Sequence, residues 1–303
     1  MDIAEADFST AAVNIEFVVG LSLNFCILLV YIGNLKNGVS LGPSDKVHLT
    51  KSLVNVSLLM MMGAQWAISF LWSYFFLLSE ILCWTVTFTV FLIFYNYWLT
   101  AVLCVYYCTN ITPCSHHAFV WLKRSLSFYL LPTVILEGLG SFAIGFPMLC
   151  FCTVEPPGNS TYRSTVIRPT LLNNVLYRSI STILGCFLPL TIALVSTTFT
   201  SWSLINHVRR MRQNNGEFTR SKFQTQINAT RTMILFLLIS LFYCVTQMAF
   251  STIQPNAVVA TFIWFVILSY PISEAAIIIR SSVRLRSALL EKVFGRKRRN
   301  SEA

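Results

Sequence analysis

The sequence predicts an all-α membrane protein, a bundle of seven transmembrane helices. The chain of 303 residues is 55% hydrophobic and only 11% charged, and its mean hydropathy is +0.65. Soluble domains carry about 25% charged residues, so a water-soluble enzyme of this length is excluded. Intrinsic disorder is excluded as well, because it requires low hydrophobicity. The apolar residues suffice for about seven spans of roughly 20 to 25 residues each.

Long gaps between charged residues mark the expected spans. No charged residue lies between Lys51 and Glu80, between Glu80 and Lys123, or between Arg231 and Glu274. Hydropathy places the helices near 12–33, 48–72, 80–109, 126–150, 178–205, 230–253 and 257–280. The segment 80–109 contains no Gly or Pro and is expected to form one helix. The bundle therefore covers 12–280, with a short external N-terminus (1–11) and a basic cytoplasmic tail (281–303).

The basic residues predict the orientation of the chain. Of its 22 Lys and Arg residues, 19 lie on the side of the C-terminus, and only Arg163, Arg168 and Arg178 lie on the other. By the positive-inside bias the C-terminus is cytoplasmic and the N-terminus extracellular. The net charge of +10 then reflects topology and attraction to anionic inner-leaflet lipid, so nucleic acid is not expected as a partner. Among four Asn-x-Ser/Thr sequons, only Asn159 falls in an external loop and is expected to carry a glycan.

Motifs of catalytic chemistry are absent from the sequence. It contains no GxxxxGK[ST], GxSxG or HExxH motif and no Cys/His spacing typical of a metal site. We therefore expect no enzyme activity, no metal and no cofactor. Cys83 could pair with Cys150 or Cys152, and the sequence leaves that choice open. A transporter is a distant alternative, because Glu137 and Glu274 are the only acids expected at membrane depth and no repeat relates the two halves.

Short motifs at fixed spacing are spread along most of the chain. The first helix carries Gly20-x-x-x-Asn24, and the fifth carries Leu188-Pro189 and then Ser203-Leu204-x-x-His207-x-x-x-Met211. The sixth helix begins with Ala229-x-Arg231, and the seventh carries Ser269-Tyr270-Pro271 before Arg284-Leu285-Arg286. The Asp/Glu-Arg-Tyr and Asn-Pro-x-x-Tyr motifs of rhodopsin-like receptors are absent. In this order and spacing the motifs resemble the vertebrate bitter taste receptor family (taste receptors type 2), which are G-protein-coupled receptors.

The resemblance implies a function and identifies where this chain diverges. A member of the family would sit in the plasma membrane, bind small bitter-tasting molecules and activate a gustducin-type heterotrimeric G protein. Three family positions differ: the Arg of the second helix is Asn55, the Lys near the end of the third is Asn110, and the His of the seventh is Glu274. The chain is thus expected to be a divergent member, and a vomeronasal type 1 pheromone receptor is the alternative.

Aromatic residues in the extracellular halves of the helices are the expected ligand contacts. The resemblance places the ligand cavity beside Trp66, Trp98 and Trp264, whose rings offer stacking and cation–π surfaces. The alternative for these residues is an aromatic belt at the lipid interface. Helical spacing extends the expected wall of the cavity to Phe91, Phe94, Val102, Tyr243, Gln247 and Phe250.

Two further sets of residues are expected to transmit the signal. A membrane carboxylate without a partner is costly, so we expect Lys51 to pair with Glu274, with Asn24 and Asn55 completing a polar network. The alternative is that Lys51 reaches the cytoplasmic interface and Glu274 is protonated. The resemblance places a second set near the G protein, although positive-inside topology alone would explain its charges: Asn110, His207, Met211, Arg231, Arg284 and Arg286.

Overall fold

The structure, a computed structural model, describes residues 3–70, 75–112, 117–154, 169–171, 175–213, 220–252, 257–282 and 285–288. The long helices are α1 (Ile3–Lys36), α2 (Pro43–Phe70), α3 (Phe75–Ile111), α4 (His117–Gly145), α7 (Leu188–Gln213), α8 (Arg220–Thr252) and α9 (Ala257–Ser281). The shorter elements are α5 (Met148–Phe151), β1 (Cys152–Val154), β2 (Pro169–Leu171), α6 (Val175–Thr182) and the π-helix η2 (Ile183–Phe187).

Seven helical segments within the described residues are long and apolar enough to cross a membrane. They span Ala11–Lys36, Pro43–Ile68, Glu80–Ile111, Tyr129–Cys150, Val175–Arg209, Gln224–Ala249 and Phe262–Ser281. The seven-helix fold class predicted from the sequence is therefore confirmed, and 80–109 lies within one helix.

Several helices begin earlier than the sequence predicts, and one span is divided. Helices α4 and α8 begin at His117 and Arg220, where 126 and 230 were expected. Helix α1 begins at Ile3, so 3–11, expected as an external segment, is helical. Hydropathy measures the apolar thickness of a span, and a helix continues beyond it wherever its backbone hydrogen bonds are satisfied. The span expected at 178–205 is divided into α6, η2 and α7, because a π-turn interrupts the regular helix around Gly185.

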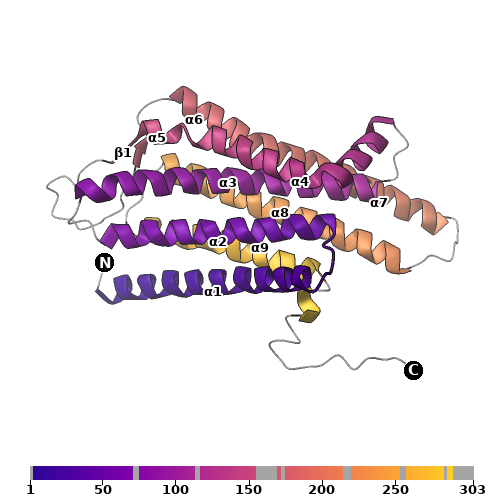
Figure 1. Cartoon of the computed structure of the whole chain (residues 1–303), viewed down its shortest axis with the longest axis horizontal. Helices are drawn as coiled ribbons and strands as arrows, with labels where there is room; N and C mark the ends of the chain where they lie inside the picture. Colours follow the sequence, from indigo (N-terminus) through magenta and orange to yellow (C-terminus); the bar gives the residue numbers. More distant parts are fainter. Residues whose placement is uncertain are drawn as a thin grey trace.

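Helix α3 occupies the middle of the bundle (Figure 1). It contacts α2, α4, α7 and α8, whereas α1 packs against α2 and α9. The helices run side by side along the longest axis of the molecule. One end carries the start of α1 and the pairing of β1 with β2, in which Cys152 lies opposite Leu171; we call it the hairpin end. The end of α1 and the start of α2 lie at the opposite end, which we call the tail end.

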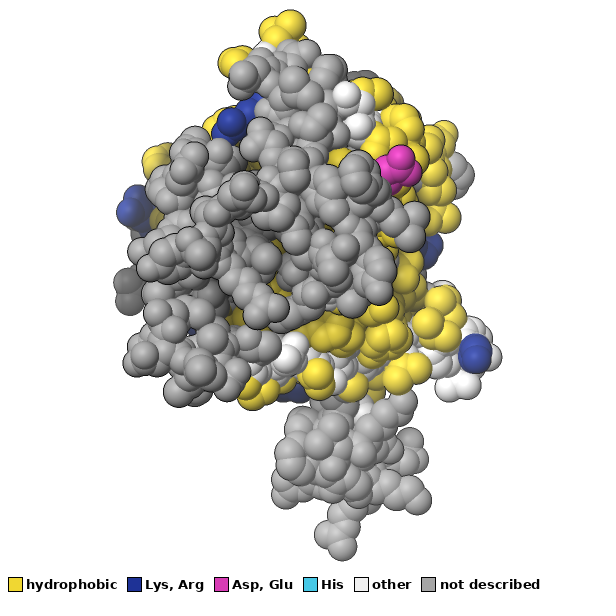
Figure 2. Space-filling view, turned by 90° about the vertical axis from the view of Figure 1, so that its left-hand side faces the viewer, with side chains coloured by type: hydrophobic (Ala, Val, Ile, Leu, Met, Phe, Trp, Pro, Cys, Tyr) yellow, Lys and Arg dark blue, Asp and Glu magenta, His cyan; other side chains and the backbone are white. Residues whose placement is uncertain are grey.

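The outer surface of the described bundle is mainly apolar. Viewed from the hairpin end, hydrophobic side chains dominate the sides of the described part of the bundle, and charged side chains are few (Figure 2). Large hydrophobic side chains such as Leu136 and Trp202 are more than 60% exposed. A soluble monomer rarely exposes contiguous apolar surface of this extent, so these side chains face lipid.

Glycines allow close approach at two helix contacts that position the interior. A Cβ on Gly20 of α1 would lie 3.0 Å from a methyl of Leu59 on α2 and 3.1 Å from Ile272 on α9. A Cβ on Gly185 would lie 2.6 Å from the ring of Phe94 on α3. The first contact brings α1, α2 and α9 together, and the second seats the π-helix directly on α3.

Candidate functional site

A buried ion pair lies at the centre of the bundle. The Lys51 ammonium on α2 is 2.8 Å from Glu274 Oε1 on α9, and both side chains are 0% exposed. The pair expected from the sequence is therefore present in the structure, and Lys51 does not extend to the interface. Removing two charges from water costs several kcal/mol per ion, so the surrounding polar groups have to solvate both.

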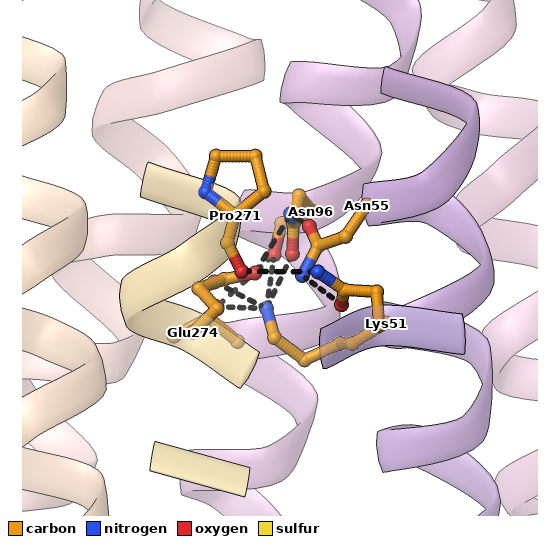
Figure 3. A network of polar contacts seen from close by, with 7 residues as sticks. Lys51, Asn55, Asn96, Pro271 and Glu274 are labelled. Atoms are coloured by element: carbon orange, nitrogen blue, oxygen red, sulfur yellow. Dashed lines mark hydrogen bonds and ion pairs between the residues drawn. The ribbon is translucent and has the colours of Figure 1, made fainter. Parts of the chain in front are cut away.

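Side chains of α3 supply most of that solvation (Figure 3). Lys51 Nζ donates to Oγ1 of Thr100 at 2.8 Å, to the backbone carbonyl of Asn96 at 3.3 Å, and to Asn96 Oδ1. Asn96 Nδ2 in turn donates to Glu274 Oε2 at 2.9 Å. Asn96 therefore contacts both charges of the ion pair at once.

Two more amides extend the network to α1. Asn96 Nδ2 donates to Asn55 Oδ1 at 2.7 Å, and Asn55 Nδ2 donates to Asn24 Oδ1 at 3.4 Å. Asn24 Nδ2 donates to the carbonyl oxygens of Gly20 at 2.9 Å and Pro271 at 3.3 Å. The polar network, which we define as Asn24, Lys51, Asn55, Asn96, Thr100 and Glu274, thus joins α1, α2, α3 and α9.

Helical spacing explains how the sequence assembles this network. Lys51 and Asn55 are four residues apart on α2, as are Asn96 and Thr100 on α3, so each pair projects from one face of its helix. The tail-end side is closed by the Phe236 ring of α8, whose centroid lies 5.2 Å from Lys51 Nζ. This contact adds a cation–π attraction and keeps water away from the ammonium.

Aromatic side chains occupy the hairpin-end side of the polar network. The rings of Tyr243 and Tyr270 stack with centroids 4.3 Å apart, and Tyr97 lies 6.4 Å and 6.5 Å from them. Gln247 Nε2 donates to the hydroxyl of Tyr243 at 2.8 Å. This tyrosine cluster joins α3, α8 and α9 one helical turn from Glu274.

A tryptophan pair lies further toward the hairpin end. Trp66 of α2 and Trp264 of α9 meet edge to face with ring centroids 6.1 Å apart. Trp264 precedes Glu274 by ten residues, a separation of about 15 Å along a helix. The tryptophan pair, the tyrosine cluster and the polar network therefore follow one another along the inside of the bundle.

The other residues expected around the ligand do not share a single face. Phe94 packs on the π-helix at Gly185, whereas Phe91 packs against α4, where a Cβ on Gly145 would lie 3.2 Å from its Cα. Val102 is buried in the core and Trp98 is half-buried. The side chain of Phe250 lies outside the described residues.

The residues expected near the G protein lie toward the tail end. Asn110, His207, Arg231 and Arg286 are exposed, and Asn110 Nδ2 donates to the carbonyl of Tyr106 at 2.9 Å. The side chains of Met211 and Arg284 lie outside the described residues, as does Asn159. Of the two partners considered for Cys83, Cys150 is a free cysteine, and the side chain of Cys152 is not among those described.

Sequence reasoning missed two members of the polar network, Asn96 and Thr100. A signal for them was available: Asn96 is the one amide within the apolar stretch from Phe75 to Thr109, and Thr100 follows it by four residues. A polar residue at that depth in an apolar helix is expected to face the bundle interior.

Seven apolar helices around a buried charged network define the class of the protein, a polytopic helical membrane protein of the seven-helix type. The model of the family described as taste receptor protein (TAS2R) matches residues 1–297. The chain belongs to this family, which confirms the resemblance seen in the sequence. The family is one of receptors.

Curated relatives agree with this assignment. The chain is 25% identical to taste receptor type 2 member 40 of Gallus gallus over 66% of each chain. It is 24% identical to member 13 of Pongo pygmaeus over 96% of this chain and 97% of that one. It is 29% identical to member 5 of Pan troglodytes over 62% of each. The first two relatives are thus matched over slightly less than two thirds of their length, and these matches favour a taste receptor over the vomeronasal alternative.

Proposed function

We propose that this protein is a bitter taste receptor of the plasma membrane. Its hairpin end and N-terminus face outward, small bitter-tasting molecules bind in the outer half of the bundle, and the tail end activates a gustducin-type heterotrimeric G protein. The observation that carries the proposal is the polar network. It joins four helices through an ion pair, and it lies on the tail-end side of the aromatic interior.

The ligand would bind at the level of the tryptophans. Trp66 and Trp264 present large faces suited to aromatic or cationic molecules. Trp98, the third tryptophan expected to contact the ligand, lies half-buried on α3. Gln247, whose amide donates to Tyr243, would anchor a polar group of the ligand. A ligand that prefers one arrangement of these rings shifts the bundle toward the state that contains it.

The polar network is suited to transmit such a shift. Tyr270 lies one turn from Glu274 on α9, and Tyr97 is adjacent to Asn96 on α3. A rotation of these tyrosines therefore displaces both the carboxylate and the amide that hold Lys51. Because bonds of the network link α1, α2, α3 and α9, their exchange changes how those helices meet at the tail end.

A calcium-release assay tests the function and the ligand site together. Cells expressing the chain with a gustducin-tailed promiscuous Gα subunit are exposed to a panel of bitter compounds, with surface level measured in the same cells. We expect a dose-dependent response that Trp98→Ala and Trp264→Ala reduce at least about tenfold in potency. Trp202→Ala, which removes a lipid-facing ring on α7, is the matched control and should leave potency unchanged.

Two results would contradict the proposal. Silence toward the whole panel at normal surface level would remove the bitter-receptor function. A robust response that Trp98→Ala and Trp264→Ala leave intact would retain the function and remove the ligand site.

A further inference from the structure

Aromatic rings line the seam between α3 and α4, away from the polar network. The ring of Phe91 meets those of Phe88 and Phe142 edge to face, with centroids 5.7 Å and 5.6 Å apart. It also stacks on the ring of Tyr95, with centroids 6.0 Å apart. The series continues toward the hairpin end through Phe146, 5.1 Å from Phe142, to Trp84, 6.3 Å from Phe146. We call these six residues the aromatic ladder.

An acidic side chain lies where the aromatic ladder ends. The Tyr95 hydroxyl donates to the carbonyl of Val134 at 3.1 Å, and its ring lies 3.3 Å from where a Cβ of Gly138 would be. Glu137 lies between these two positions on α4, and its carboxylate is within electrostatic range of Tyr95. Tyr95 is therefore the ladder residue whose contacts on α4 flank the acid.

The Glu137 carboxylate has no counterpart among the residues that the structure describes. Its Oε2 is buried and accepts no hydrogen bond from them. Helix α3 contains no Lys or Arg, and those of α4 are Lys123 and Arg124, about 20 Å away along the helix. Lys51 is engaged by Glu274. A carboxylate at membrane depth without a partner is costly, so a bound cation would stabilise it.

The surface around Glu137 faces the bilayer. The ladder rings Trp84, Phe88, Phe142 and Phe146 are 39–49% exposed, and Leu136 and Leu139 beside Glu137 are more than 60% exposed. Glu137 lies eight residues from Gly145, the end of α4, or about 12 Å along the helix. That depth is beyond the interfacial zone occupied by lipid headgroups, so the occupant has to be a molecule that dissolves in the hydrocarbon.

We propose that Glu137 and the aromatic ladder form a membrane-facing binding site for lipophilic amines. The ammonium group pairs with the Glu137 carboxylate, the rings of Phe91 and Tyr95 contribute cation–π and stacking contacts, and the apolar part of the ligand lies along the ladder toward Trp84. The site uses Glu137 and the ladder residues of α3 and α4, whereas the proposed taste ligand contacts Trp66 of α2, Trp264 of α9 and Trp98 of α3. The inference is therefore independent of the taste function.

Binding to the purified full-length chain tests the proposal. The protein in phosphatidylcholine nanodiscs is titrated with 4-phenylbutylamine and, separately, with its uncharged N-acetyl derivative, while the midpoint of thermal unfolding is measured. We expect a saturable rise with the amine alone. Glu137→Gln keeps the shape of the side chain but removes its charge, and it should raise the half-saturating amine concentration about tenfold or more.

Glu16→Gln is the matched control. Glu16 lies on α1, and its Oε2 is likewise buried without a hydrogen bond among the described residues, yet it does not border the aromatic ladder. Glu16→Gln should leave the half-saturating concentration unchanged. Equal binding of the neutral derivative, full affinity in Glu137→Gln, or an equal loss in Glu16→Gln would each overturn the proposal.

Two further arms keep the test decisive. A diazirine derivative of the amine should label α3 and α4 of the unmodified chain, and labelling confined to other helices would overturn the assignment even if Glu137→Gln did not fold. Phosphatidylethanolamine nanodiscs supply a primary ammonium headgroup. If they raise the unfolding midpoint in a Glu137-dependent way and block the amine, the occupant is a lipid headgroup and the proposal fails.

Discussion

At the scale of single residues, the buried ion pair accounts for two of the departures from the family pattern. By the resemblance to the family, Asn55 replaces an Arg and Glu274 replaces a His. In this chain the positive charge comes from Lys51, one turn from Asn55 on the same helix, and Glu274 supplies the opposing charge at 2.8 Å. Asn55 then serves as an uncharged link between Asn24 and Asn96.

Breaking the ion pair from one side should be strongly destabilising. Lys51→Met leaves the Glu274 carboxylate buried without its cation, which typically costs about 3–5 kcal/mol. We expect a lower unfolding midpoint and little surface protein, whereas Lys46→Met on the same helix, at an exposed position, should change neither. Lys51→Glu combined with Glu274→Lys should recover surface expression lost in the single variants. Failure of this double variant, with both singles impaired, would argue against the pair.

Asn96 should be as important as the charges, because it contacts both of them. Asn96→Leu preserves the approximate volume but leaves polar groups of Lys51, Asn55 and Glu274 with fewer partners. Each buried group left unsatisfied costs about 1–3 kcal/mol. Thermal unfolding in detergent should detect the loss, and Asn110→Leu at an exposed site of the same helix should unfold like the unmodified chain. Similar midpoints for the two variants would show that Asn96 has no special role.

At the scale of elements, the π-helix adapts the fifth span to α3. The turn at Ile183–Phe187 places Gly185, which has no side chain, against the ring of Phe94. π-turns inside α-helices often occur at functional sites. Here the turn shifts the register between α6 and α7, so the residues on either side of Gly185 face the bundle with a different rotation than one uninterrupted helix would give.

Filling the space at Gly185 should disturb this contact. A Cβ there would lie 2.6 Å from the Phe94 ring, and overpacking of this kind costs about 1–3 kcal/mol. Gly185→Ala should therefore lower the unfolding midpoint, and Phe94→Leu should restore part of it. Gly140→Ala is the control, since no atom lies within 4 Å of its Cβ position. A stable Gly185→Ala variant would mean that Phe94 moves aside freely.

At the scale of the whole molecule, the apolar exterior and the charge distribution determine how the chain sits in a membrane. The lipid-facing side chains form the sides of the bundle, and the basic residues gather overwhelmingly in segments on the side of the C-terminus. Under the proposed orientation these segments face the anionic cytoplasmic leaflet. The hairpin end then faces the outside, where a taste ligand arrives.

Glycan mapping tests that orientation. In cells, treatment with peptide N-glycosidase F should increase the gel mobility of the chain, and Asn159→Gln should abolish this shift. Asn110→Gln, which removes a sequon at the tail end, should retain it, because only sites exposed to the lumen receive a glycan. A glycan lost in Asn110→Gln but retained in Asn159→Gln would place the hairpin end in the cytoplasm and reverse the proposed topology.

The sequence by itself determined the seven spans, the family and the ion pair. The spans can be predicted because lipid requires long apolar helices. The pairing of Lys51 with Glu274 can be predicted because a buried charge needs an opposite one. It did not determine which helix faces meet. Only the packed structure shows that Asn96 joins the polar network. It also shows that Phe91 packs against α4 while Phe94 packs against Gly185. Glu137 lies at the end of the aromatic ladder on the lipid side. These outcomes depend on the rotation and close approach of helices, which apolar residues on every side of a membrane helix leave unspecified until the helices pack together.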